Sequence, residues 1–316
     1  MRVRTLRKDM DSKGQWTGHV AVAAAYTIFG FNIIICKDLA NAQWISPLGL
    51  FCLRSAGAAL LFWMVGCFLP EESVSKRDLL QMFAASMLGL FLTQMLFLKA
   101  IVLTTPVDVS IITSVTPVFV MFAAAVWLKE PITLKKAGGV LLSFAGIVFL
   151  ILNTTHSTQG MLRSKPMGIV LMILNCLCFA SYLVLFKRLI SRYHVVTFMK
   201  WMFLFSMVAS IPFDVGELSG LSFASVPVRW LWELAYLILF STFFAYLFIP
   251  IGQKRLRPTV VSLYTYLQPL IACVCSMVLG MDRMTWAKLL AMVFVFTGVV
   301  LVNRSRAAAD PQDAKS

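Results

Sequence analysis

Charged residues are scarce in this chain of 316 residues. Only 13% are Asp, Glu, Lys or Arg, whereas a soluble domain of ordinary composition carries about 25%. Too few polar residues are therefore present to cover a surface in water, which excludes a soluble globular fold. Hydrophobic residues make up 59% of the sequence and the mean hydropathy is +0.83. Most of the surface must therefore face lipid.

Motifs for nucleotide-driven or enzymatic chemistry are also missing. The sequence has no G-x-x-x-x-G-K-[ST] phosphate loop and no H-E-x-x-H zinc motif. The three histidines stand at segment ends, and the seven cysteines lie in apolar runs without zinc or redox spacing. We therefore expect no direct use of ATP, no cofactor, no metal site and no catalytic residues. A membrane-embedded enzyme is the least supported of the functions that the sequence leaves open.

Acidic residues are outnumbered two to one, with 28 Lys and Arg against 14 Asp and Glu. In a soluble protein a net charge of +14 would suggest nucleic acid. Here the basic residues gather in tails and short connectors, where they orient membrane helices instead. With the N-terminus in the cytoplasm, 19 of them fall on the inner side and 7 on the outer side. The sequence therefore predicts an inner or plasma membrane protein with both termini cytoplasmic.

Apolar runs long enough to cross a bilayer fill most of the chain, since about 20 residues span the hydrocarbon. A basic cytoplasmic tail at 1–17 precedes them, a polar tail at 303–316 follows, and a linker at 153–166 divides them into two fives. The fold class predicted is an all-α membrane protein with ten transmembrane helices, at residues 18–37, 46–69, 79–100, 106–128, 133–152, 167–189, 195–213, 229–250, 258–280 and 284–302.

The second half of the chain repeats the first. Residues 105–150 align with 257–302 at an offset of 152 positions without a gap. Because five helices are an odd number, the second copy enters the membrane from the opposite side. The sequence therefore predicts two inverted five-helix repeats, 18–152 and 167–302, with the substrate site where they meet near the midplane. The matches that apolar composition does not explain are Pro106 with Pro258, Pro117 with Pro269, and Gly146 with Gly298.

Short motifs at these positions resemble the drug/metabolite transporter superfamily and, within it, the EamA-like transporters. They cover about residues 18–302, and the junction at 128–133 is the most specific of them. The motifs are Phe-Gly-Phe-Asn at 29–32, Leu53 with Arg54, and Leu-Lys-Glu-Pro-Ile-Thr at 128–133 followed by Gly138 and Gly146.

The resemblance implies a secondary transporter with a central cavity and cytoplasmic termini, often an exporter of amino acids and other small metabolites. Two departures leave the substrate open. Phe29 stands where the motif usually has Trp, and Asp282-Arg283 stands where many relatives have Glu followed by a small residue or Pro.

Polar side chains in the middle of the predicted helices are the candidates for substrate binding, because exposing them to lipid is unfavourable. A hydrogen bond between helices is the structural alternative for each. Tyr264, Tyr266 and Gln268 crowd one helix beside Pro269, where aromatic rings could hold an apolar or amphipathic solute. We expect a cavity lined by Asn32, Arg54, Gln94, Thr113, Tyr182, Tyr246, Tyr264, Tyr266 and Gln268.

Two cations lie inside predicted helices. Arg54 is about eight residues into its helix, where it could line the cavity and bind a carboxylate through two parallel hydrogen bonds. Alternatively, its long stem could carry the charge to the membrane surface. Both interpretations stay open for Arg54. Lys200 is nearer the end of its helix, which favours the second.

Pro117 and Pro269 each lie about eleven residues into a predicted helix, so a kink is expected near mid-membrane. Each proline deprives a carbonyl one turn back, near Thr113 or Thr265, of its usual partner. The prolines are interpreted either as hinges beside the cavity or as static kinks that improve packing.

These features predict a secondary transporter that moves small organic metabolites by alternating access, as an exporter. The solutes would be amino-acid-like, or other small anionic or amphipathic compounds. The alternative is a lipid or lipid-linked sugar flippase of the same superfamily, which would favour a lateral opening and several cavity cations. The expected partners are a small-molecule substrate and the lipid bilayer, with no nucleic acid. Coupling to a proton or exchange gradient, and a homodimer, are compatible with the sequence but not specified by it.

Overall fold

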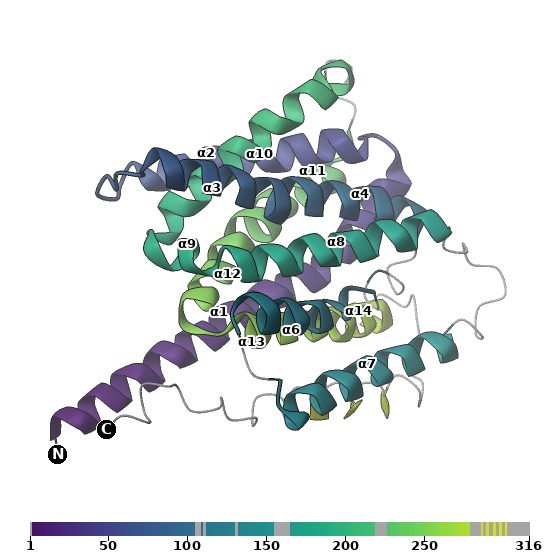
Figure 1. Ribbon diagram of the computed structural model, residues 1–316. Helices are drawn as coiled ribbons and strands as arrows, with labels where there is room; N and C mark the ends of the chain where they lie inside the picture. Colours follow the sequence, from purple (N-terminus) through teal and green to yellow (C-terminus); the bar gives the residue numbers. More distant parts are fainter. Residues whose placement is uncertain are drawn as a thin grey trace.

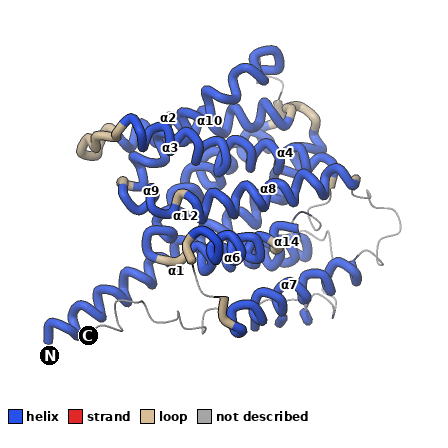
Figure 2. Tube along the Cα trace, viewed as in Figure 1, coloured by secondary structure: helices blue, strands red, loops and turns tan. Residues whose placement is uncertain are grey.

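The computed structural model is helical throughout the part of the chain that it describes, and no strand occurs there (Figure 2). The described residues are 2–104, 109, 112–129, 132–154, 165–218, 226–278, and single positions between 286 and 301.

Within these residues, six helical segments are long and apolar enough to cross a membrane. The prediction of an all-α, multi-pass membrane protein is therefore confirmed for the described residues. The count of ten helices stays a prediction, because most of 284–302 lies outside them. The six segments are Gln15–Ala42, Pro47–Gly66, Lys76–Leu103, Pro166–Leu185, Val195–Pro212 and Val228–Arg255.

The elements of the two halves follow one another in the same order (Figure 1). The first half contains α1 (Arg2–Ala42), α2 (Pro47–Gly66), α3 (Lys76–Ser86), η1 (Met87–Leu92), α4 (Thr93–Leu103), α6 (Thr116–Trp127) and α7 (Leu134–Thr154). The second contains α8 (Pro166–Leu185), the short α9 (Lys187–Arg192), α10 (Val195–Leu218), α11 (Val228–Tyr236), η3 (Leu237–Phe244), α12 (Ala245–Arg255), α13 (Pro258–Leu263), η4 (Tyr264–Tyr266) and α14 (Leu267–Val278).

Helix α1 differs from the sequence prediction at its start. It begins at Arg2 rather than at residue 18, so the basic segment predicted as a tail continues the first spanning helix. Residues 2–13 contain neither proline nor glycine, which removes the strongest reason for the helix to stop there.

The third spanning segment of each half contains a π-helical stretch, and the two stretches are related. The π-helices η1 and η3 end at Leu92 and Phe244, which are separated by the repeat offset of 152. In each half a threonine hydroxyl donates to the carbonyl five residues earlier: Thr93 to Leu88 (3.3 Å) and Thr242 to Leu237 (2.7 Å). Wider turns of this kind are frequent at functional sites.

Two lysines in equivalent positions cap two equivalent helix ends. Lys37, near the end of α1, donates to the carbonyl of Thr104 (2.8 Å), directly after α4. Lys187, the first residue of α9, donates to the carbonyl of Leu256 (2.9 Å), directly after α12. Each ammonium group satisfies carbonyls that have no partner within their own helix.

The N-terminal parts of the spanning segments of α1 and α8 lie at opposite ends of the molecule, that of α1 at the Leu256 end and that of α8 at the Thr104 end. A Cβ added to Gly18 would lie 3.1 Å from a Leu256 side-chain carbon, and one added to Gly168 would lie 2.6 Å from Thr104 Cγ2. Helix α1 therefore runs from the Leu256 end of the molecule to the Thr104 end, and α8 runs the other way. The first helices of the two halves are antiparallel.

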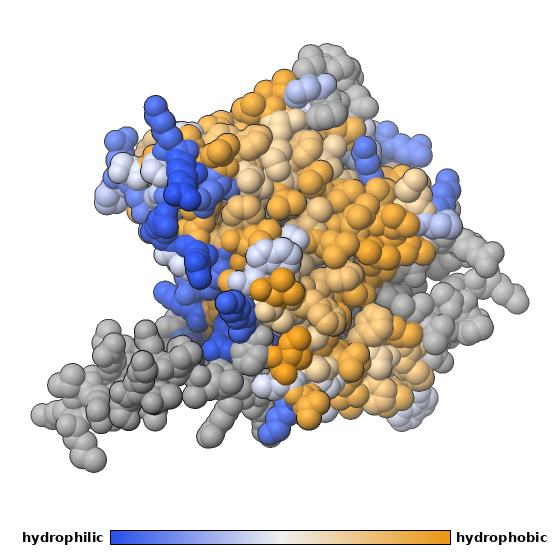
Figure 3. All heavy atoms as spheres, in the orientation of Figure 1, coloured by the Kyte–Doolittle hydropathy of each residue, from blue (hydrophilic) through white to orange (hydrophobic). Residues whose placement is uncertain are grey.

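Basic side chains gather at the Leu256 end of the molecule. Figure 3 shows hydrophilic residues along one edge of the molecule, beside a broad hydrophobic face. The basic residues at this end include Lys76, Arg77, Lys187, Arg188, Arg192, Lys254, Arg255 and Arg257.

A carboxylate joins the two halves at this basic end. Asp78, in the first turn of α3, accepts hydrogen bonds from Arg192 (2.8 Å) and from the Tyr193 hydroxyl (2.6 Å). The bond to Asp78 raises the pKa of Tyr193, because the phenol would have to ionise beside a negative charge. Lys254 donates to the Tyr193 carbonyl (2.5 Å), so α3, the α9–α10 link and α12 meet here.

Close helix contacts depend on glycine where α1 crosses α12. A Cβ added to Gly252 would lie 1.9 Å from Val22 Cγ2, far inside van der Waals contact. Among the described residues, a Cβ added to Gly138, in α7, would have a Leu301 carbon at 3.8 Å as its neighbour.

We expect Gly252→Ala to destabilise the folded protein by about 1–3 kcal/mol, because the added methyl forces α1 and α12 apart. Gly138→Ala is the matched control, and it should be neutral or stabilising because alanine is the better helix former. Thermal unfolding in detergent measures both. Equal melting temperatures for the two variants would contradict the close packing of α1 and α12.

Candidate substrate cavity

A cavity of about 80 Å³ lies among α1, α4, the start of α6, α8, α12 and the η4–α14 junction. Its wall contains hydroxyl, amide and aromatic groups but, among the described residues, no charged side chain. The lining residues are Tyr26, Phe29, Asn32, Ile33, Thr93, Gln94, Phe97, Thr113, Thr116, Asn175, Phe179, Tyr246, Thr265 and Gln268.

Most of the polar lining consists of residues that the internal repeat relates to one another. An offset of 152 residues relates three such polar pairs, and an offset of 150 relates one pair of phenylalanines in the wall. The cavity therefore lies where the two halves meet. The pairs are Gln94 with Tyr246, Thr113 with Thr265, Thr116 with Gln268, and Phe29 with Phe179.

One of these pairs is bonded directly. Gln94 Nε2 donates to the Tyr246 hydroxyl (2.5 Å), and the two residues are 152 positions apart. Equivalent residues of two halves related by a twofold axis can touch only close to that axis. The cavity wall therefore includes the point about which the halves are related. The other amide atom, Gln94 Oε1, is buried and accepts no hydrogen bond.

The structure corrects the predicted kink at Pro117. The helix before this proline is interrupted by a turn at Ser114 and Val115, and α6 begins afresh at Thr116. Pro117 therefore occupies the first turn of a new helix, where its missing N–H group costs no hydrogen bond. The break leaves Thr113 and Thr116 in the cavity wall on either side of the turn.

The equivalent proline in the second half also follows an irregular turn. Pro269 is the third residue of α14, directly after the tight 3₁₀ turn η4. Thr265, in the middle of that turn, lines the cavity and donates to the Ser262 carbonyl (2.6 Å). Both prolines thus adjoin irregular backbone beside the cavity, the arrangement typical of broken membrane helices.

A chain of hydrogen bonds connects the cavity wall to Arg54. Asn32 Oδ1, in the wall, accepts from the Ser241 hydroxyl (2.6 Å), and Ser241 accepts from Arg54 (3.2 Å). Arg54 also donates to Thr242 (2.9 Å) and approaches Cys36 Sγ at 3.7 Å.

Arg54 fits neither interpretation offered by the sequence. Its exposed fraction is 2%, so its side chain does not reach the membrane surface. It does not line the cavity either, because Asn32 and Ser241 stand between them. Lys200 is half-buried, with Nζ 5.0 Å from the centroid of the Trp63 ring, and is also absent from the cavity wall.

The other predicted residues divide between the wall and its surroundings. Asn32, Gln94, Thr113, Tyr246 and Gln268 line the cavity. Tyr182, Tyr264 and Tyr266 do not.

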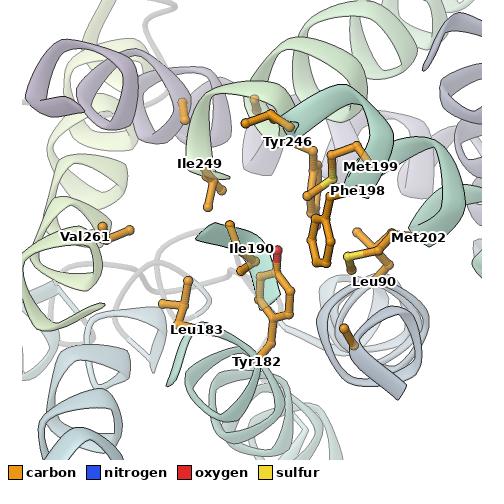
Figure 4. Packing of buried hydrophobic residues seen from close by; sticks show 14 of the residues in the cluster. Leu90, Tyr182, Leu183, Ile190, Phe198, Met199, Met202, Tyr246, Ile249 and Val261 are labelled. Carbon is orange, nitrogen blue, oxygen red and sulfur yellow. The ribbon is translucent and has the colours of Figure 1, made fainter. Parts of the chain in front are cut away.

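Tyr182 projects from α8 into the hydrophobic core near Leu90 and Ile190 (Figure 4). Tyr264 is held by His19, whose Nδ1 lies 2.7 Å from the tyrosine hydroxyl. Tyr266 is 1% exposed and belongs to the buried core. These three rings therefore pack the helices around the cavity.

Sequence reasoning missed nine of the lining residues. Of these nine, Phe29 and Phe179 are related to each other by the repeat, and Thr116 and Thr265 are each related to a residue that was predicted. Aligning the two halves position by position could therefore have found these four. Only some of the aromatic and threonine residues were selected, because residues of these types are also common in the packing between membrane helices. The nine are Tyr26, Phe29, Ile33, Thr93, Phe97, Thr116, Asn175, Phe179 and Thr265.

Known proteins resemble this chain over most of its length. The model of the EamA-like transporter family matches residues 16–152 and again residues 166–304. Two uncharacterized transporters of Archaeoglobus fulgidus, each aligned over 295 residues, are 22% and 28% identical; the alignments cover 91% and 90% of this chain and 99% and 96% of theirs. The uncharacterized transporter YetK of Bacillus subtilis is 24% identical over 290 residues, 91% of this chain and 87% of its own.

One solved crystal structure has a TM-score of 0.69 with this chain at 18% sequence identity. The superposition covers 92% of this chain and 96% of the other. At this identity the likeness shows the fold alone.

Replacing Tyr246 by Phe should lower the stability of the protein by about 1 kcal/mol, because it removes the bond between the halves and leaves the Gln94 amide without a partner. Tyr26→Phe is the matched control, since the Tyr26 hydroxyl is buried without a hydrogen-bond partner among the described residues and its loss should cost nothing. Melting temperatures in detergent distinguish the two. A larger drop for Tyr26→Phe would contradict this account of the cavity wall.

Proposed function

Because the chain belongs to the EamA-like transporter family, we propose that it is a secondary transporter that moves a small organic metabolite across the membrane by alternating access. The observation that carries the proposal is the cavity wall itself, in which repeat-related residues from both halves face one space. Two similar, oppositely oriented halves can form two states of similar energy, one open to each side.

In the proposed architecture, ten helices form two inverted repeats. The antiparallel course of α1 and α8 supports it, because an odd number of spans per repeat reverses the second copy. The exchange of contacts at the two ends supports it as well: Lys37 caps the Thr104 end, and Lys187 caps the Leu256 end. Each of these two lysine contacts joins the first and third spanning segments of one repeat.

The proposed movement involves the irregular turns before Pro117 and Pro269. At about 80 Å³ the cavity is smaller than the roughly 300–1,000 Å³ of typical small-molecule sites. It has to widen to admit a metabolite, and the turn at Ser114–Val115 offers a place where α6 can tilt without breaking regular helical hydrogen bonds.

We propose that the basic Leu256 end faces the cytoplasm, because Lys and Arg are retained on that side of membrane proteins. The first spanning helix starts there, so the N-terminus is cytoplasmic. Export is the direction that the resemblance to related carriers implies.

A lipid or lipid-linked sugar flippase is the second candidate. It would need several cations to hold a phosphate headgroup, whereas the described cavity wall contains no charged side chain and has one arginine behind it. The wall therefore favours a small solute over a lipid headgroup.

A bulky residue in the cavity should stop transport without unfolding the protein. We expect Thr113→Trp to reduce solute counterflow in proteoliposomes to background, because its side chain faces the cavity. The control is Phe122→Trp on the same chain segment, where the native side chain is 56% exposed to the surroundings. A screen in which no solute is taken up above protein-free vesicles would reject the transporter proposal. Transport by Thr113→Trp at the wild-type rate would reject this cavity as the pathway.

The proposed orientation predicts opposite labelling of two single-cysteine variants. Cys67, exposed at the end of α2, should react with an impermeant maleimide only in inside-out vesicles. Asn41→Cys, at the exposed end of α1, should react only in intact cells or right-side-out vesicles. The reverse pattern would place the basic end outside.

A further inference from the structure

Arg54 is a buried cation without an acidic partner among the described residues. It is 2% exposed, and its hydrogen-bond partners among these residues are the hydroxyls of Ser241 and Thr242 and the thiol of Cys36. The ion pairs formed by the described residues all lie elsewhere. Arginine stays protonated at physiological pH, so this positive charge persists in a low-dielectric surrounding. Hydroxyl dipoles solvate the charge but do not neutralise it.

The hydrogen bonds that begin at Arg54 transmit the effect of its charge to the cavity wall. Ser241 accepts from Arg54, which can only donate, so the serine hydrogen is committed to Asn32 Oδ1. That bond fixes the orientation of the Asn32 amide. Its remaining group is the N–H₂ donor, in a residue that lines the cavity. Hydrogen bonds in such a chain polarise one another, so this donor is stronger than that of an isolated amide.

The repeat shows that this arrangement occurs on one side of the cavity alone. The residue equivalent to Ser241 is Gly89, and the residue equivalent to Asn32 is Tyr182. At that second position Gly89 packs against the tyrosine ring, where an added Cβ would lie 2.5 Å from a ring carbon. One of the two equivalent places therefore holds a charged polar chain, built from Asn32 and Arg54 of the first half and Ser241 of the second, and the other holds a packed aromatic contact.

A second feature adds positive potential to the same cavity. Helix α6 begins at Thr116, in the cavity wall, after the interrupted turn. The N-terminal end of a helix carries partial positive charge and favours anions. Among the described lining residues there is no carboxylate to offset this helix end or Arg54.

We propose that the transported solute is a small organic acid whose carboxylate binds at Asn32, with Arg54 as a positioning residue behind it. This inference rests on the proposed transport function. The carboxylate accepts from the Asn32 amide and supplies the counter-charge that Arg54 lacks. The hydrocarbon part of the acid lies against the aromatic lining, which includes Phe97 and Phe179.

Matched pairs of acids and amides test this directly. Isovalerate with isovaleramide, and phenylacetate with phenylacetamide, differ little except in the carboxylate. Binding is measured by thermal shift on purified full-length protein, and transport by counterflow in proteoliposomes. We expect wild-type protein to prefer each acid over its amide by about tenfold or more, as a unit charge in a partly desolvated site would produce.

Arg54→Gln should abolish that preference, because the acid binds more weakly while the amide binds as before. Arg54→Lys should restore part of it, because the charge returns without the fork of donors. Lys200→Gln is the matched control: it removes another cation within a described span, one that lies outside the cavity wall, and it should leave the preference unchanged. A purely structural role for Arg54 would instead lower acid and amide binding together.

Ser241→Asp keeps the test decisive if the Arg54 variants fail to fold. The new carboxylate pairs with Arg54 inside the protein, so the variant should fold at least as stably as the Arg54 variants and lose the preference for acids. Retention of the preference by Ser241→Asp, or equal binding of acid and amide by wild-type protein, overturns the inference. Uptake of some other solute, but of neither acid, would also overturn it while the transporter proposal stands. Failure of every solute to enter would remove the proposed function itself.

Discussion

The hydrocarbon of the bilayer offers no hydrogen bonds, and the details of this structure depend on that constraint. Each irregularity in the spanning helices has its own local partner. Thr93 and Thr242 satisfy carbonyls within the two π-helical stretches, and Thr265 does so at the 3₁₀ turn. Lys37 and Lys187 satisfy the last carbonyls of the third spanning segments. Irregular backbone in a spanning helix needs partners of this kind, because lipid supplies none.

The two halves resemble each other in how their helices pack, but they differ in the polar residues beside the cavity. Packing follows it closely: the lysine caps, the glycine contacts and the bond between Gln94 and Tyr246 all obey the offset. Such agreement makes the two halves interchangeable as structural parts, which is the condition for two states of similar energy. Polarity departs from it at Asn32 and Ser241, whose equivalents are a tyrosine and a glycine. A carrier that must recognise an asymmetric solute needs a departure of this kind, since a symmetric wall would bind either end of the solute equally.

Hydropathy predicted the membrane class, and the resemblance of the motifs at 29–32 and 128–133 predicted the family, because both depend on composition and order along the chain. They also led to five lining residues, among them Gln94 and Tyr246, which the offset pairs. The position of Arg54 behind the wall could not be predicted, because hydropathy says nothing about which way a helix is rotated or what stands in front of a side chain. Pro117 was assigned to a helix interior for a similar reason: an apolar run continues through Ser114 and Val115 without any sign that the backbone turns there. Tyr182 was predicted to line the cavity but does not, because its ring packs against Gly89, a residue that is far away in sequence.

An uncompensated charge behind a small cavity also bears on how a carrier of organic acids would work. Closing the cavity around nothing leaves Arg54 in a low dielectric with dipoles alone, whereas closing it around a carboxylate brings in an opposite charge. In a carrier of this kind, the loaded protein would pass between its two open states more easily than the empty one. The described wall contains no acid or histidine to carry a proton back. For the proposed carrier, the buried arginine would favour exchange of one organic acid for another over an empty return, because a bound anion offsets the cost of burying the charge on each crossing.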